Sequence, residues 1–210
     1  MADQTMSLAR KGVPPTYFGP FLVTSQVPSC PFYLNIQIAN TKCKIFHFTR
    51  LTYALVNLKP ILPGHVLVSP RRITPRVSDL TSPETSDLFL TVRRVGRMIE
   101  RVYGASSLNI AIQDGVEAGQ SVPHVHTHVI PRRRMDLDHV GGTDKIYEML
   151  DGEEGDLGRI QREATGEGDG GGRQTRFPAV DNDERKPRSM EEMEEEAEKL
   201  AVEMEKEPLD

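Results

Sequence analysis

Three histidines alternate with a valine and a threonine in the segment His124-Val125-His126-Thr127-His128. In a β-strand, side chains two residues apart lie on the same face. We therefore expect a strand from about Val122 to Ile130, ended by Pro131, with all three imidazoles on one face. The other face can pack on a core, which leaves the histidine face for chemistry.

Three interpretations of this cluster compete. Structural histidines are common singly, but three on one strand face argue against that role. Two of them could bind one zinc ion, whereas all three could not, because alternate Cα atoms of a strand are about 6.6 Å apart. The third interpretation is catalysis at phosphorus, since histidine can attack as the free base or donate a proton near neutral pH. We favour this third interpretation, with His126 as the nucleophile between His124 and His128.

A loop with two glycines leads into the histidine segment. It spans 114–121, and Gly119 would let the backbone approach a ligand closely. Gln120 and Ser121 offer polar side chains to a phosphate, and the backbone amides there could cradle it. Alone, such a loop is typical of an ordinary polar turn; beside three histidines it indicates a phosphate site.

Short β-rich runs surround these segments. Residues 52–57 and 65–69 are rich in β-formers, and the link 59–64 contains two prolines and a glycine. We expect these runs to form an antiparallel pair of strands. Residues 108–112 alternate between isoleucine or leucine and smaller residues, which predicts a third, half-buried strand.

Two helices are predicted from periodic apolar residues. The first should have Ser82 as its N-cap and Pro83 at its first position, and it should stop at Gly104. Its apolar residues recur at spacings that define one helical face: Leu88, Val92, Val95, Ile99 and Val102. In the second helix, Ser189 and Glu192 form a capping box. Its apolar stripe is compatible with docking on the body or with a solvated acidic helix.

The chain divides into four regions. Residues 1–16 are polar and expected to be disordered, and residues 17–150 carry nearly all of the periodic apolar pattern. Residues 151–188 are rich in glycine and charge, and we expect a flexible loop there because little apolar surface is available to bury. Residues 189–207 are expected to be helical.

Charge narrows the class of protein. Ten acidic residues and two lysines fall within residues 189–210, so this end is acidic and the remainder is mildly basic. A weak positive bias suits a small anionic substrate and does not indicate a nucleic-acid partner. With no long apolar run and no secretory signal, we expect no membrane partner and a cytoplasmic setting, with the nucleus as a second one. Cys30 and Cys43 have no metal-binding spacing and should be reduced.

Together these segments resemble the histidine triad superfamily, whose signature is His-x-His-x-His-x-x with hydrophobic residues at x. Thr127 is a polar departure from that signature. The chain is most similar to the fragile histidine triad branch, the dinucleoside polyphosphate hydrolases, over residues 46–150, and more weakly over 17–27 and the C-terminal helix. The segments that carry the likeness are Phe18-Gly19, Ala54-Leu55-Val56-Asn57, Lys59-Pro60, Pro63-Gly64-His65-Val66-Leu67-Val68, Gln113-Asp114-Gly115, Glu117-Ala118-Gly119-Gln120 and Ile130-Pro131-Arg132.

This resemblance implies an α+β fold with a five-stranded antiparallel sheet, a long helix and a C-terminal helix, assembled as a homodimer. It also implies hydrolysis of diadenosine triphosphate. His126 would attack the α-phosphorus and expel ADP, and water would then release AMP from an adenylyl-histidine. A magnesium or manganese ion would enter with the substrate rather than occupy a fixed protein site.

The resemblance also assigns roles to individual residues. His65 and His124 would support the nucleophile, and His128 would bind phosphate. Leu55 and Phe46 would line the adenine pocket, and Asn57 would contact the ribose. The complete substrate-binding set is Asn57, Gln113, Gly119, Gln120, Ser121, Val122 and His128.

Two segments depart from the family pattern, residues 28–45 and the long loop at 151–188, and three other functions stay open. Residues 28–45, which contain both cysteines, are expected to be an insertion or a gene-model artefact. A nucleoside phosphoramidase of the related histidine triad branch would share Gln120-Ser121-Val122. A nucleotide-binding signalling protein and a metal-binding protein are the other two alternatives.

Overall fold

A computed structural model describes residues 17–18, 21–22, 44–120, 122–150 and 188–208. The expected disordered N-terminus, nearly all of the expected insertion at 28–45 and of the loop at 151–188, and Ser121 lie outside the described residues. Among the described helices, none has the length and apolar character needed to cross a membrane.

The centre of the fold is the predicted five-stranded antiparallel sheet, with strand order β3-β4-β5-β7-β6. A separate antiparallel pair, β1 with β2, lies outside it. The strands are β1 (Tyr17–Phe18), β2 (Phe21–Leu22), β3 (Ile45–Phe48), β4 (Thr52–Val56), β5 (Val66–Pro70), β6 (Ser107–Ala111) and β7 (Thr127–Arg132). The helices are α1 (Ser82–Tyr103), α3 (Met190–Glu205) and the short 3-10 turns η2 (Val77–Asp79), η3 (Val116–Ala118) and η4 (Asp138–Val140).

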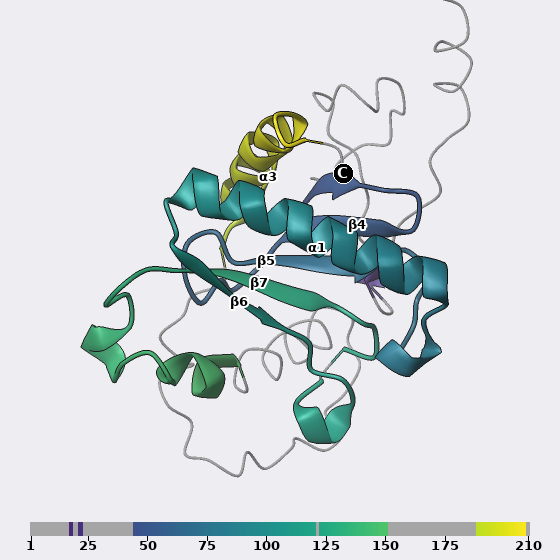
Figure 1. The fold of residues 1–210 in the computed structure, drawn as a ribbon, viewed down its shortest axis with the longest axis horizontal. Coiled ribbons are helices and arrows are strands. Elements are labelled where there is room, and N and C mark those ends of the chain that lie inside the picture. The colour runs from purple at the N-terminus through teal and green to yellow at the C-terminus, as the bar shows by residue number, and fades with distance from the viewer. Residues whose placement is uncertain (1–16, 19–20, 23–43, 121, 151–187, 209–210) are drawn as a thin grey trace, which may run out of the picture.

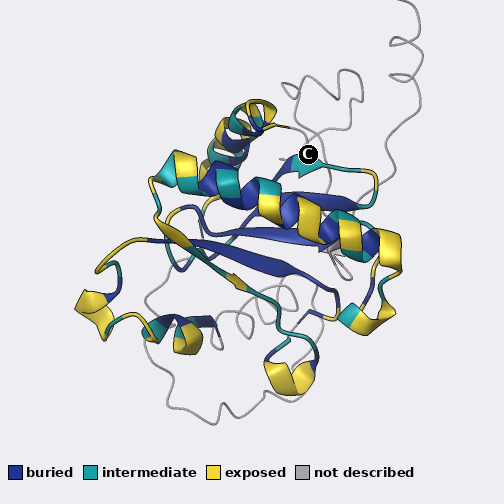
Figure 2. Ribbon diagram, in the orientation of Figure 1, coloured by how far each residue is buried: buried dark blue, intermediate teal, exposed yellow. Residues whose placement is uncertain are grey.

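Both long helices cover the same face of the sheet (Figure 1). α1 crosses β4, β5 and β7, and α3 lies beside α1 against β3 and β4. The predicted apolar stripe of α1 is confirmed: Leu88, Val92, Val95 and Ile99 are buried, and Val102 packs against the same core. The inner strands β4, β5 and β7 are buried along their whole length (Figure 2). Because successive side chains point to opposite faces, both faces of the sheet are covered there.

The N-cap of α1 lies one residue earlier than predicted. Thr81, and not Ser82, is the cap, because its hydroxyl accepts the amide of Glu84 while the Glu84 carboxylate accepts the amide of Thr81 at 2.9 Å. This reciprocal pair satisfies two helix-end donors, which Ser82 could not do with Thr85 three residues on. The predicted stop is confirmed, since Gly104 is left-handed with φ of 59°.

The strand that carries the third histidine begins later than the sequence predicts. β7 starts at Thr127 rather than near Val122. Before it, the amide of Val125 donates to the carbonyl of Thr74 at 2.7 Å instead of to a neighbouring strand. The prediction of one strand holding all three histidines is therefore wrong, and only His128 lies within the strand.

The end of β7 also differs from the prediction. The strand continues through Pro131 to Arg132 instead of stopping before the proline. The last pair with β5 is Val66 with Val129, whereas β6 still pairs with Pro131 through Leu108. One side of Pro131 thus has no strand that needs its missing amide, a position where proline is tolerated.

β6 is an edge strand, and its predicted half-burial is only partly correct. Leu108 packs against the core, but Ile110 is 49% exposed. Its partner Val129 points into the core under α1, so Ile110 lies on the same sheet face but beyond the helices that would cover it. Among the described strands, β6 thus leaves one edge without a partner, with an exposed isoleucine on it.

The C-terminal helix docks on the body, which settles the two alternatives for its apolar stripe. Met193, Ala197, Leu200 and Met204 are all buried in the core beside α1 and β3. The predicted capping box is present, with the Ser189 hydroxyl accepting the amide of Glu192. Residues of α3, near the C-terminal end of the described chain, therefore share one core with residues of β3 and β4.

Truncating the buried stripe of α3 should destabilise the whole fold. Leu200→Ala should lower the free energy of unfolding by about 2–5 kcal/mol, because Leu200 is fully buried. Val202→Ala is the matched control, since Val202 is 56% exposed and should change stability by less than about 0.5 kcal/mol. Chemical denaturation of both variants measures the difference. Equal effects would mean that α3 is solvated.

Candidate active site

The candidate site lies on the sheet face opposite α1 and α3. Strand pairing aligns one row of residues across that face: Ile45, Leu55, Leu67, His128 and Ala111. Leu67 and Leu55 belong to a second apolar cluster, separate from the core under the helices. His128 therefore lies next to Leu67 within this row, while its neighbour Val129 points into the helix-covered core.

Phe46 is not part of this row. Its side chain packs in the core with Ala54 and Leu200, under the helices. The expected place for Phe46 in an adenine pocket is therefore wrong, because adjacent strand residues point to opposite faces. Ile45 takes the position beside Leu55, on the same face as His128.

His65 fixes the proton position on His128. The amide of Ile61 donates to Nδ1 of His65 at 3.2 Å, so a neutral His65 carries its proton on Nε2. That Nε2 lies 2.9 Å from Nδ1 of His128, which must then accept. His128 consequently carries its own proton on Nε2, where it can donate to a phosphate oxygen.

His126 has the opposite tautomer. Its Nδ1 lies 2.7 Å from the carbonyl oxygen of His124, which can only accept, so the proton is on Nδ1. The Nε2 of neutral His126 then bears the lone pair that a nucleophile needs.

His124 is a buried, neutral histidine. The amide of Thr74 donates to its Nδ1 at 3.1 Å, and its side chain is fully buried. Burial first, and then the charge that His126 can carry, lower the pKa of His124 to about 4. His124 is therefore uncharged near neutral pH, and it contributes to the site through its backbone carbonyl.

The rings lie closer together than a continuous strand would place them. The ring centres of His126 and His128 are 5.2 Å apart, as are those of His65 and His128. The strand-spacing argument against a shared metal ion does not apply, because His126 precedes β7. Among the described residues, however, no group of three His, Cys, Asp or Glu side chains is placed to hold a metal ion.

The glycine loop is tied down beside the cluster. Gly115 and Gly119 both have positive φ, at 104° and 99°, a conformation that glycine adopts without strain. The Gln120 side chain accepts the amide of Gly115 at 3.2 Å and donates to the carbonyl of Pro75 at 2.8 Å. It also lies 3.4 Å from the carbonyl of His124, the group that orients His126. Gln120 thus links the loop to the candidate nucleophile.

The other predicted substrate-binding residues lie around the same centre. Asn57 is buried, and its amide nitrogen is 3.3 Å from His65 Nε2. Val122 packs in the apolar cluster with Leu67, and Gln113 is half-buried between β6 and the loop. The structure thus brings Asn57, His65, Val122 and the three histidines of the cluster together, whereas Phe46 lies under the helices; Ser121 is outside the described residues.

Three residues of the site were missed in the sequence. The Thr74 amide orients His124, and the Ser69 hydroxyl donates to the carbonyl of Val125 at 2.6 Å. Arg188 donates from Nε to the carbonyl of Asn57 at 3.1 Å. The Thr74 contact uses a backbone amide, which every residue except proline has, so residue identity does not predict it. Arg188 comes from a distant segment, and no local pattern links it to the histidines.

A family model for the HIT domain matches residues 39–135. A bis(5′-nucleosyl)-tetraphosphatase [asymmetrical] from Schizosaccharomyces pombe is 49% identical over 162 residues, which cover 75% of this chain and 86% of that protein. A bifunctional bis(5′-adenosyl)-triphosphatase/adenylylsulfatase from Arabidopsis thaliana is 54% identical over 54% of this chain. A bis(5′-adenosyl)-triphosphatase from Saccharomyces cerevisiae is 50% identical over 65% of it.

The matches span different shares of these relatives. They cover 62% of the Arabidopsis protein and 56% of the Saccharomyces protein, less than two thirds of each. Among solved structures, the NitFhit protein of C. elegans superposes with a TM-score of 0.50 and 34% identity, over 69% of this chain and 31% of that one. The sheet and helices described above thus match a fold already seen by experiment.

The neutral state of buried His124 should make stability depend on pH. Its folded pKa of about 4 lies below the ordinary 6.5, so unfolding takes up a proton and stability falls as pH falls from 6.5 towards 4. Between pH 7.5 and 5 this contribution is about 1–2 kcal/mol. Denaturation of His124→Gln should show a correspondingly shallower pH dependence than the wild type. The exposed His139→Gln is the control, and an equal slope in all three proteins would contradict a neutral His124.

Proposed function

The chain belongs to the HIT domain family, and from that membership we propose that it hydrolyses dinucleoside polyphosphates, with His126 as the nucleophile. One observation carries the proposal: the partners at Nδ1 of two neighbouring imidazoles differ, a carbonyl oxygen for His126 and the ring of His65 for His128, which assigns their protons to opposite nitrogens. His126 offers a lone pair at Nε2, and His128 offers an N–H donor at Nε2. A phosphate group between them would meet a nucleophile and a donor together.

The first step is transfer of a nucleotidyl group to the protein. The Nε2 lone pair of His126 forms a bond to the α-phosphorus, and the bond from that phosphorus to the bridging oxygen breaks. The electron pair of the broken bond leaves with the nucleoside diphosphate or triphosphate. The His128 N–H stabilises the charge that develops on the phosphate oxygens. The Nδ1–H bond to the His124 carbonyl stabilises the positive charge on the His126 ring.

The second step regenerates the histidine. Water attacks the phosphorus of the nucleotidyl-histidine, a P–O bond forms, and the P–N bond breaks. His126 recovers its lone pair at Nε2, the mononucleotide departs, and the proton of the water is lost to solvent or to product phosphate. The two steps together consume one water and yield one mononucleotide and one shorter polyphosphate.

The surroundings of the histidines suit a nucleotide. Ile45, Leu55 and Leu67 are nearly fully buried and form an apolar wall that leads along the sheet to His128. Asn57 lies beside His65, where the expected ribose contact would be made. The loop with Gly119 and Gln120 is anchored next to the His124 carbonyl, on the side proposed for the phosphates.

We propose diadenosine triphosphate as the preferred substrate, with AMP and ADP as products. The relatives support dinucleoside polyphosphates as the substrate class more firmly than they support a particular number of phosphates. Two carry the name bis(5′-adenosyl)-triphosphatase, and one carries the name bis(5′-nucleosyl)-tetraphosphatase. We further propose that Mg²⁺ or Mn²⁺ arrives bound to the polyphosphate, since the described side chains offer no group of three metal ligands.

We also propose that two copies of the chain associate through β6. This strand is at the sheet edge, and its backbone can pair with the same strand of a second copy. Ile110 on β6 and Phe89 on α1 are about half exposed, so apolar surface is available on the described part of each copy.

Removal of the His126 imidazole tests the mechanism. His126→Gly should lower turnover of diadenosine triphosphate by several orders of magnitude while substrate binding persists, because the covalent route is lost. Stopped reactions of wild type with labelled substrate should yield labelled protein, and those of the variant should not. Because His126 is buried, the melting temperature should fall as well, so turnover is compared at a temperature at which the variant is folded. Near-normal turnover by the variant would eliminate His126 as the nucleophile.

Product analysis tests the substrate. With diadenosine triphosphate, the wild type should yield AMP and ADP, and with the tetraphosphate AMP and ATP at a lower kcat/KM. Chelation of divalent ions should abolish turnover, and added Mg²⁺ or Mn²⁺ should restore it. An adenosine phosphoramidate in parallel decides the main alternative: faster turnover of that compound than of either dinucleotide would make the protein a phosphoramidase.

A charge at the sheet edge tests the association. Ile110→Glu should convert a dimer to a monomer, because it places a carboxylate in the paired edge. Val202→Glu, at an exposed site on α3, should leave the dimer intact. Sedimentation velocity distinguishes the two species. A wild-type monomer, or an Ile110→Glu dimer, would contradict association through β6.

A further inference from the structure

We propose that Arg188, immediately before the N-cap of α3, is a positioning residue for the contact between His65 and His128. Its side chain donates to the carbonyl oxygen of Asn57 from both Nε, at 3.1 Å, and Nη2. Its backbone amide donates to the carbonyl of Leu58 at 3.1 Å. A single residue from the far end of the chain thus holds two successive carbonyls at the end of β4.

Arg188 is itself held in a sheltered place. Its Nη1 pairs with the Glu196 carboxylate, and the two side chains are only 18% and 15% exposed. The Tyr103 hydroxyl donates to the same carboxylate at 2.6 Å. Such an ion pair, shielded from water and supported by further hydrogen bonds, restricts the guanidinium more than an exposed pair would. The direction of Arg188 towards Asn57 is therefore fixed.

The carbonyls that Arg188 holds begin the loop that places His65. Within this loop the Asn57 side chain accepts the amide of Lys59 at 3.0 Å, and the amide of Ile61 donates to His65 Nδ1 at 3.2 Å. These local bonds and the contacts of Arg188 help to hold the path of the loop between β4 and β5. His65 in turn contacts His128 at 2.9 Å. A shift of the Asn57 backbone would change the His65 contact that sets the His128 proton.

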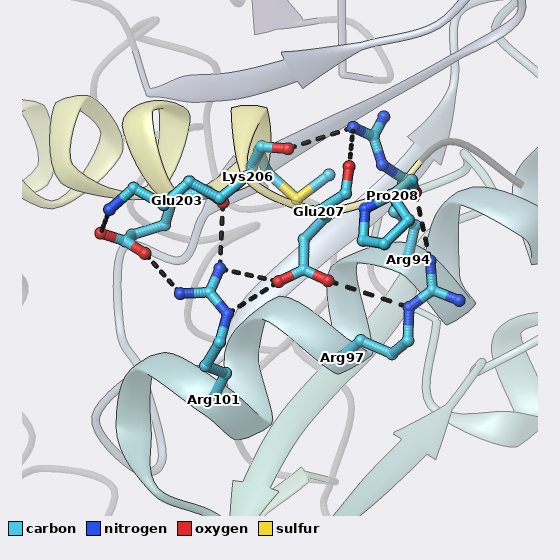
Figure 3. A network of polar contacts seen from close by, with 8 residues as sticks. Arg94, Arg97, Arg101, Glu203, Lys206, Glu207 and Pro208 are labelled. Atoms are coloured by element: carbon cyan, nitrogen blue, oxygen red, sulfur yellow. Dashed lines mark hydrogen bonds and ion pairs between the residues drawn. The ribbon is translucent and has the colours of Figure 1, made fainter.

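The other end of α3 is anchored independently (Figure 3). Arg94 donates to the carbonyls of Met204 and Glu207, and Arg101 donates to the Glu203 carbonyl and to both nearby carboxylates. The Glu207 carboxylate also pairs with Arg97 at 3.8 Å. The helix is therefore clamped to α1 at a point remote from Asn57. The two ends can be perturbed separately.

The direct consequence is that α3 contributes to catalysis as well as to the core. The helix lies on the sheet face opposite the histidines, and Arg188 reaches around the end of β4 to their supporting loop. Arg188 acts through Asn57 and His65 and does not touch the reacting atoms in this arrangement. The expected effect of Arg188 on kcat rests on the proposed hydrolase function, whereas its expected effect on the proton positions of His65 and His128 does not.

The test compares Arg188→Ala and Arg188→Lys with Glu207→Gln. Arg188→Ala should lower kcat for diadenosine triphosphate about tenfold with a smaller change in KM, because transition-state contacts from His128 weaken. Arg188→Lys should recover part of the loss, since one ammonium can still reach a carbonyl. Glu207→Gln loosens the far end of α3, so it should lower the melting temperature and keep kcat.

Imidazole ¹⁵N chemical shifts supply a readout that needs no substrate. In wild type the shifts of His65 and His128 should each report a proton on Nε2, and in Arg188→Ala they should report a mixture of tautomers. Unchanged shifts in folded Arg188→Ala would overturn the inference, as would an equal loss of kcat in Glu207→Gln. A wild type that has the expected tautomers but hydrolyses no dinucleotide would instead overturn the proposed function. The comparison of shifts between wild type and Arg188→Ala would then still decide the role of Arg188.

Discussion

The site depends on one hydrogen bond, from Nδ1 of His126 to the backbone carbonyl of His124. A carbonyl can only accept, so this contact decides which ring nitrogen of His126 keeps its lone pair. His65 and His124 meet backbone amides at the same ring position, and the opposite polarity of those partners puts their protons on Nε2. The alternation of donors and acceptors, more than the presence of several histidines, gives each imidazole a separate chemical role.

The place where β7 begins makes this alternation possible. Regular strand pairing would engage the carbonyl of His124 in the sheet and would hold successive imidazoles at strand spacing. Here the chain joins the sheet only at Thr127, so the His124 carbonyl is available to the ring of His126. His128, one residue into the strand, is instead fixed by pairing with Leu67. Because of this boundary, His128 is a rigid donor on the strand and His126 is a separately oriented nucleophile before it.

The sequence predicted what depends on local periodicity. The apolar stripe of α1, the β4–β5 pair and the apolar stripe of α3 follow from residue spacing, and each is present. The family resemblance identified the histidines that gather at the site. The predicted start of β7 was wrong because the Val125 amide donates a hydrogen bond to the carbonyl of Thr74, a residue far earlier in the chain, instead of to the sheet. The tautomers and the contact of Arg188 were equally out of reach, since they depend on backbone atoms and on which segments meet in space.

The acidic C-terminal segment looked separate from the mildly basic body, and the structure shows why both charges belong to one unit. Negative residues in the first turn of α3 oppose the positive end of its dipole. At its last turn, where carbonyls lack helical partners, Arg94 and Arg101 of α1 supply donors, and Glu207 accepts from Arg101. Desolvating Glu207 would be costly without these arginines, so the pairing favours a single docked position over a sliding one. That fixed position is what allows Arg188, at the opposite end of the helix, to hold the loop behind the histidines.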